Sequence, residues 1–238
     1  MVHNKLQFIF LAVVLGMANG CVTTSPPLTM QIGKMPEILR VKEKEVQLAY
    51  GLVNDRSGII GMTSLWQGQV SYGFKEQWQL DIGALLTERT DNDSPESVMT
   101  TVGAKYGFLA HKRWSAAVPF AIGLGCGGYN GDDLGTSDTT DDIDSTFKCS
   151  DGFAYGAYSG VDFGYRFGKV VGIYQGNRLQ FSKAAGLPST ILGLHMLGLQ
   201  FDLGKKLYLS VEGGPAWFSN SENSDLYGKG SGAIGFHW

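Results

Sequence analysis

Apolar and polar residues alternate along residues 64–88, which is the most regular pattern in the chain. In the first half, the apolar face carries Trp66, Val70, Tyr72 and Phe74. After a break at residues 75–76 the alternation resumes, with Trp78, Leu80, Ile82, Ala84 and Leu86 on the apolar face. A period of two indicates β-strands with one apolar and one polar face. Each half is about ten residues long, which is the length a tilted strand needs to cross a bilayer.

Similar alternation recurs along the chain and predicts about ten strands, with eight as the alternative count. The expected ranges are 45–53, 64–74, 77–88, 99–109, 114–125, 153–167, 170–182, 190–203, 207–218 and 227–238. The range 170–182 is the least regular, and 190–203 starts apolar on both faces, so their facing stays open. Pro119 has no backbone donor, which predicts a bulge or break in its strand.

The connections between the expected strands alternate between short and long. Short ones lie near Lys75, Lys112, Lys169 and Lys205, and long ones near Arg56, Asp93, Asp138, Leu187 and Asn223. Bacterial outer-membrane barrels combine short periplasmic turns, longer external loops and an even number of strands. The final strand, with alternating apolar residues before the aromatic Trp238, resembles the terminal strand that the barrel-insertion machinery reads in that class.

Residues 45–238 therefore resemble a small outer-membrane β-barrel of a Gram-negative bacterium. The resemblance implies an all-β, closed antiparallel up-and-down transmembrane barrel with its long loops extracellular. The implied partners are outer-membrane lipids, lipopolysaccharide and, through the strand that ends at Trp238, the insertion machinery. A soluble lipocalin-like barrel around an apolar ligand is the alternative. Charge is scarce on the polar face and aromatics are dense on the apolar face, which favours an apolar face in contact with lipid.

The N-terminus predicts a signal peptide over residues 1–20. Lys5 precedes an apolar run that is too short to cross a bilayer as a helix, and Ala18 and Gly20 suit cleavage just before Cys21. The site resembles a bacterial lipobox, which implies lipidation of Cys21; ordinary secretion with the same cleavage is the alternative. Residues 21–44 show no sustained alternation and predict a lipidated N-terminus and flexible tether before the barrel at 45–238.

The two remaining cysteines, Cys126 and Cys149, flank the longest loop. In an oxidising compartment, an even pair in these positions predicts a disulfide. The same loop is acidic, and its weak candidates for metal binding are Asp138, Asp141, Asp142 and Asp144. Their spacing does not fit the EF-hand pattern, so a solvated acidic loop is the favoured interpretation.

Composition and motifs narrow the function without identifying a ligand. Charged residues make up 17% of the chain and the net charge is −3, which gives no electrostatic case for nucleic-acid binding. No P-loop, HExxH, GxSxG or CxxC motif is present, and no cofactor is expected.

Charged and amide side chains on the polar face are expected to pair across a narrow lumen, because unpaired buried charge is costly. The expected network comprises Gln67, Gln69, Gln79, Asp81, Lys105, Asp162, Arg166 and Glu212. A barrel of about ten strands is too narrow for a general porin. The sequence thus favours a non-enzymatic outer-membrane barrel of structural or surface-interaction type.

An enzyme acting on envelope lipids is the other membrane alternative. Ser210 and Glu212 share one face of a strand, but the sequence does not place a histidine beside them. The mature chain has three histidines, His111, His195 and His237, and none lies in a recognisable catalytic motif. The enzyme question therefore stays open at this stage, leaning toward no catalysis.

Overall fold

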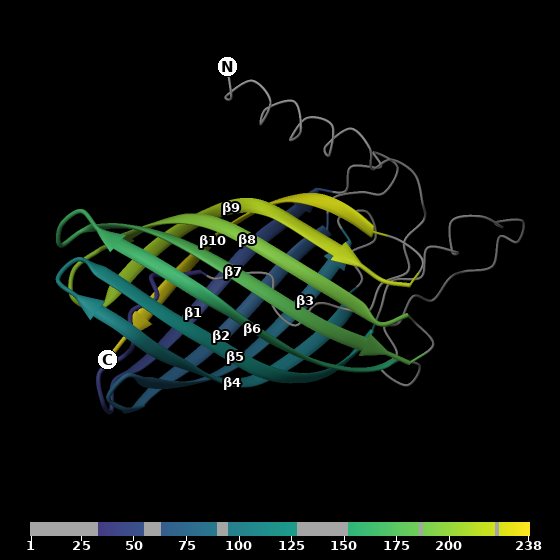
Figure 1. The fold of residues 1–238 in the computed structure, drawn as a ribbon, viewed down its shortest axis with the longest axis horizontal. Coiled ribbons are helices and arrows are strands. Elements are labelled where there is room, and N and C mark those ends of the chain that lie inside the picture. The colour runs from purple at the N-terminus through teal and green to yellow at the C-terminus, as the bar shows by residue number, and fades with distance from the viewer. Residues whose placement is uncertain (1–32, 55–62, 90–94, 128–151, 186–187, 222–223) are drawn as a thin grey trace, which may run out of the picture.

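A computed structural model describes residues 33–54, 63–89, 95–127, 152–185, 188–221 and 224–238 as a closed β-barrel of ten tilted strands (Figure 1). The strands are β1 Lys44–Asn54, β2 Thr63–Lys75, β3 Trp78–Arg89, β4 Pro95–His111, β5 Trp114–Gly127, β6 Phe153–Arg166, β7 Val171–Ala184, β8 Thr190–Asp202, β9 Leu207–Ser219 and β10 Ser224–His237. The prediction of an all-β, up-and-down barrel is confirmed, with ten strands rather than eight.

Each strand pairs antiparallel with its neighbours in the sequence, and β1 closes the barrel against β10. At the closing seam, Lys44 and Trp238 exchange two backbone hydrogen bonds of 3.0 Å each. The four short connections, β2–β3, β4–β5, β6–β7 and β8–β9, lie at one end of the barrel, together with the C-terminus (Figure 1). This end is called the short-turn end below. No helix among the described residues is long and apolar enough to cross a membrane.

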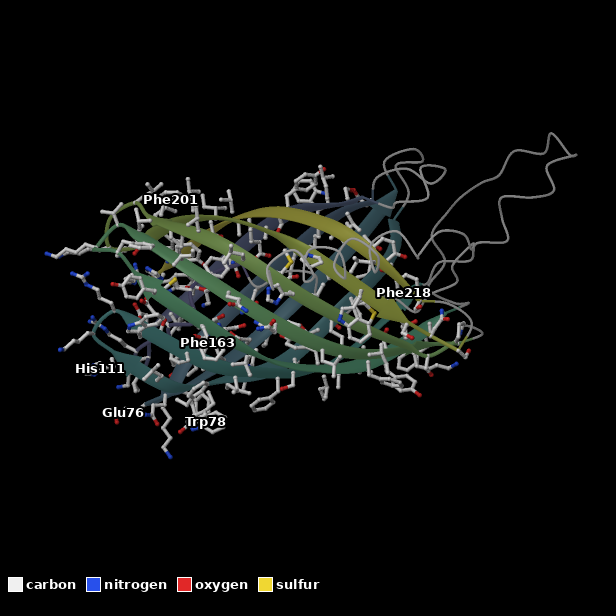
Figure 2. The ribbon with its side chains drawn as sticks, turned by 45° about the horizontal axis from the view of Figure 1, so that its top comes forward. Glu76, Trp78, His111, Phe163, Phe201 and Phe218 are labelled. Atoms are coloured by element: carbon white, nitrogen blue, oxygen red, sulfur yellow. The ribbon has the colours of Figure 1, made fainter. Side chains whose placement is uncertain are left out.

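The outer wall carries the apolar face that the alternation identified. Ile122 exposes 68% of its surface, Leu48 60% and Trp66 51%, although they are large apolar residues. The residues that alternate with the apolar ones point inward; in β2 and β3, for example, Ser71 and Gln79 expose 1% and 0%. Figure 2 shows Trp78 and Phe201 on the outer edge of the barrel. The predicted facing of β2 and β3 is therefore confirmed: the apolar face lies outside and does not surround a central ligand site as in a lipocalin-like barrel.

The interior nearer the long connections is filled by apolar side chains. Leu65, Leu85, Met99, Leu194 and Phe218 are all buried in one cluster. The inward facing of Leu194 in β8 and of Tyr174 in β7 settles the two strands whose facing the sequence left open. Further toward the short-turn end, the interior is polar and charged.

Two prolines interrupt the hydrogen-bonded ladders. The pairing of β5 with β6 skips Val118 and Pro119, as the missing backbone donor of Pro119 predicts. The pairing of β8 with β9 skips Gly214 and Pro215 in the same way, a break that the sequence analysis did not anticipate. Both breaks lie in the interior of long strands.

Candidate functional site

Residues 33–43, the luminal segment, enter the barrel at the short-turn end, with residues 33–36 and 39 buried inside it and residues 40–42 exposed at its rim. Gly33, Lys34, Met35 and Pro36 are all buried, and Lys34 exposes only 4% of its surface. This part of residues 21–44 was expected to be a flexible tether, and for these residues that expectation is wrong. Their polar backbone and side-chain groups find partners on the inward faces of the strands, which a free tether would leave to water.

The first residues of the luminal segment are bound to β9 and β1. The backbone nitrogen of Gly33 donates to Glu212 Oε2 at 2.8 Å, and Ser210 Oγ donates to the carbonyl oxygen of Gly33. Lys34 Nζ donates to Glu45 Oε1 at 2.5 Å, and the two side chains expose 5% and 3%. Because both charges are withdrawn from water, their mutual pairing is needed to offset the cost of burial.

The segment then contacts further strands of the wall, β8, β6 and β3. Met35 donates its backbone N–H to Gln200 Oε1 at 2.9 Å, and Leu39 donates to Gln79 Oε1 at 3.3 Å. Glu37 forms a two-pronged ion pair with Arg166, whose third contact is Asp202. The luminal segment is thus attached around the inner wall and lies across the lumen.

Inward-facing glycines make room for it. A Cβ atom at Gly107 would lie 2.5 Å from Ile38 Cγ1, and one at Gly164 would lie 2.6 Å from Met35 Cε. At Gly73, a Cβ would lie 2.1 Å from the carbonyl oxygen of Arg40. Larger residues at these places would collide with the luminal segment, so the bare backbone of these glycines is part of how the segment fits.

A second charged cluster lies in the lumen beside the luminal segment. Arg178 binds both carboxylate oxygens of Asp162, and the pair exposes 5% and 1% of its side chains. Asp81 accepts hydrogen bonds of 2.6 Å from both Ser71 and Gln79. Lys105, 5% exposed, is attracted electrostatically by Asp81 and Asp162.

The structure brings the eight residues of the expected lumen network to the inward side of the barrel. Gln69 donates to Ser71 at 3.1 Å, and Gln67 lies beside it on the same face of β2. The sequence analysis missed the partners Lys34, Glu37 and Arg178. Lys34 and Glu37 lie outside any alternating pattern, and Arg178 lies in the strand whose facing was open. The one available signal was their charge, in a chain of which only 17% is charged.

The residues considered for catalysis are dispersed. Ser210 and Glu212 both bind Gly33, so they hold the luminal segment. Among the histidines, His237 Nδ1 lies 3.4 Å from Glu45 Oε2, and His111 is the last residue of β4, at the short-turn end (Figure 2). His195 faces outward from β8 and contacts Asn177.

Cys126 is buried near the end of β5, whereas Cys21, Cys149 and the four aspartates Asp138, Asp141, Asp142 and Asp144 lie outside the described residues.

Comparison with known proteins identifies the fold. No family model and no curated protein matches the sequence. The β domain of the Bordetella autotransporter BrkA superposes with a TM-score of 0.51 at 10% identity, covering 83% of this chain and 100% of that one. The N-terminal β-barrel domain of Pseudomonas aeruginosa OprF gives a TM-score of 0.36 at 10% identity, covering 83% and 98%.

The attachment invasion locus protein Ail of Yersinia pestis is a further similar structure, with a TM-score of 0.32, 11% identity, and coverage of 83% and 99%. The BrkA superposition, together with the ten-stranded closed barrel, shows that this chain has the fold of outer-membrane β-barrel proteins.

Proposed function

We propose that the protein is a non-conducting barrel of the bacterial outer membrane, anchored additionally by lipid on Cys21, with a structural or surface-contact role. The outward apolar belt supports the membrane location, because residues such as Ile122 and Leu48 would otherwise expose most of their surface to water. In this role the belt contacts outer-membrane lipids and lipopolysaccharide. The strand that ends at Trp238 would be read by the barrel-insertion machinery.

The filled lumen is the observation that carries the proposal of a non-conducting barrel. The luminal segment lies across the short-turn end, the Asp162–Arg178 pair lies further in, and the apolar cluster around Leu194 fills the interior beyond. A pore for hydrated solutes needs a continuous aqueous path, and apolar side chains packed together exclude water. The lumen is therefore filled at three successive depths, and this argues against a porin.

The direct test is electrical. The mature chain, refolded into planar lipid bilayers, is expected to give no stable channel steps, whereas a porin refolded in the same lipid gives steps under the same voltage. Heat-modifiable migration in gels would first show that the sample is a folded barrel. Reproducible, long-lived steps from the folded protein would contradict the proposal.

Envelope-lipid chemistry is the competing proposal, and His195 on the outer wall is the observation that favours it. Mass profiles of membrane lipids from cells with and without the protein separate the two. A lipid species that changes mass only when His195 is present, and not in a His195→Leu strain, would replace the structural role with an enzymatic one.

A disulfide between Cys126 and Cys149 is part of the proposed envelope role. The end of β5 lies beside the start of β6: Gly127 N donates to Gly152 O at 2.9 Å, and Cys126 pairs with Phe153. Cys149 is only three positions before Gly152 in the sequence, which supports the pairing. The closed loop would stabilise the fold by roughly 3 kcal/mol. Non-reducing gels of the Cys149→Ser variant test it.

A further inference from the structure

A polar pair lies on the lipid-facing wall, away from both ends of the barrel. His195 in β8 and Asn177 in β7 are cross-strand partners whose side chains both point outward. His195 Nδ1 and Asn177 Oδ1 are 2.6 Å apart. Each residue lies near the middle of its strand, so the pair sits within the apolar belt rather than at its rim. Polar side chains are costly at that depth unless their hydrogen-bonding groups are satisfied.

The pair leaves one acceptor and one donor unused. A carbonyl oxygen only accepts, so in this hydrogen bond the imidazole Nδ1 donates to Asn177 Oδ1. In a neutral ring, Nε2 is then an acceptor, and the amide nitrogen of Asn177 still carries its N–H donors. Among the residues that the structure describes, neither atom makes another hydrogen bond.

Two outward hydroxyl groups, those of Thr100 and Ser159, are satisfied by the protein itself. Thr100 Oγ1 donates to the carbonyl oxygen of Leu124 at 2.9 Å, and Ser159 Oγ donates to that of Pro119 at 3.1 Å. The unused groups of the His195–Asn177 pair therefore differ from these two hydroxyl groups, which the protein satisfies itself.

The pair borders a hollow of about 660 Å³ in the outer wall. Its lining includes Val118, Ser159, Leu179 and Trp217, and it extends over five neighbouring strands, from β5 to β9. Gly160 and Gly193, which bear no side chain, also line it, and the two proline breaks lie on either side. Its size is in the range of small-molecule sites, roughly 300–1,000 Å³.

The shape of the hollow favours a lipid over a second copy of this chain. If a two-fold axis passed through the hollow, two hollows would face each other and leave a gap, whereas protein interfaces pack as densely as interiors. A single lipid chain can instead enter the hollow and contact its apolar lining. A hydroxyl group is both donor and acceptor, so one hydroxyl can serve His195 Nε2 and the Asn177 amide at once.

We propose that this hollow binds one lipid that carries a hydroxyl group on an acyl chain. The hydroxyl donates to His195 Nε2 and accepts from the side-chain amide of Asn177, while the chain lies along Leu179 and Trp217. The inference rests on the proposed membrane location, because only there is the outer wall in contact with lipid.

The test uses the mature chain in nanodiscs of phosphatidylcholine doped with a phosphatidylethanolamine that carries a 3-hydroxytetradecanoyl chain. The matched lipid carries a tetradecanoyl chain. Native mass spectrometry measures how many copies of each lipid stay bound. We expect roughly tenfold preference for the hydroxylated lipid, corresponding to about one or two hydrogen bonds. His195→Leu and Asn177→Leu should each abolish the preference.

The control variant is Gln175→Leu, which removes an outward polar side chain two positions from Asn177 on the same strand and should keep the preference. Equal retention of both lipids by a barrel that inserts normally would overturn the lipid site and leave the membrane location intact. The lipid site would also be overturned if the native protein gave the mass of a dimer and His195→Leu gave only the monomer, because the His195–Asn177 pair would then bind a second copy of the chain. Failure of the chain to insert at all would instead overturn the proposed function.

Discussion

At the scale of single residues, the two arginine–carboxylate pairs of the lumen differ in their access to water. Asp162 and Arg178 expose 1% and 5% of their side chains, whereas Glu37 and Arg166 expose 45% and 20%. Both pairs have two-pronged geometry, which is the strongest arrangement for these groups. The difference in burial should therefore decide what each pair contributes to stability.

Replacing Asp162 by Asn should lower the free energy of unfolding by roughly 3–5 kcal/mol, because it leaves the charge of Arg178 buried without its counter-charge. Glu37→Gln at the more exposed pair should cost about 1 kcal/mol or less. Guanidinium unfolding in lipid vesicles, followed by tryptophan fluorescence, measures both. Equal losses in the two variants would show that burial does not control the energetics of this lumen.

These pairs also show how far sequence reasoning reaches at this scale. Asp162 and Arg166 were assigned inward because a period of two puts alternate residues on one face. Their partners were not, because the residue that meets Asp162 depends on the register of β6 against β7. Alternation gives the face of a residue, but register and barrel curvature determine its neighbours, and in β7 even the face was open.

At the scale of elements, the luminal segment has neither a helical nor a strand pattern, and this is why the sequence did not predict its place. Its conformation follows from contacts with the wall: Lys42 N donates to Gly73 O at 2.7 Å, and Gly73 N donates to Glu43 O at 2.9 Å. Lys42 also has a positive φ of 71°, which non-glycine residues seldom adopt. The conformation of such a segment is determined by its contacts with the folded barrel, so no local sequence pattern predicts it.

Gly73→Ala should displace the luminal segment. The new Cβ would lie 2.1 Å from the carbonyl oxygen of Arg40, a backbone atom that moves only if the segment moves. In a Leu39→Cys background, where position 39 is 8% exposed in the native protein, thiol labelling should accelerate roughly tenfold, a shift in local opening of about 1.4 kcal/mol. The measurement is the labelling rate of the folded barrel in detergent.

Gly68→Ala is the matched control, since it lies on the opposite face of the same strand and its Cβ would approach only Leu48 Cδ2, at 3.6 Å. It should leave the labelling rate of Leu39→Cys unchanged. If Gly73→Ala labels no faster than Gly68→Ala, the luminal segment does not depend on the space that Gly73 provides.

At the scale of the whole molecule, the antiparallel order of the strands and the alternating connection lengths place all short connections at one end, as the sequence predicted. We expect the opposite end to face the cell exterior. In a background without Cys126 and Cys149, Ser57→Cys in a long connection should react with a membrane-impermeant maleimide on intact cells. Lys112→Cys in a short connection should react only after the outer membrane is permeabilised. The reverse pattern would invert the orientation.

The barrel and the proposed lipid on Cys21 would be two separate means of membrane attachment, and a Cys21→Ser variant should remove only the second. A single acyl group gives only marginal membrane binding, whereas a barrel with a continuous apolar belt is held by its whole outer surface. We therefore expect the variant to lose the added lipid mass in intact-protein mass spectrometry yet to stay with the membrane pellet after alkaline carbonate extraction. Release of the variant into the soluble fraction would mean that the strands do not span the membrane, and unchanged mass would mean that Cys21 is not lipidated.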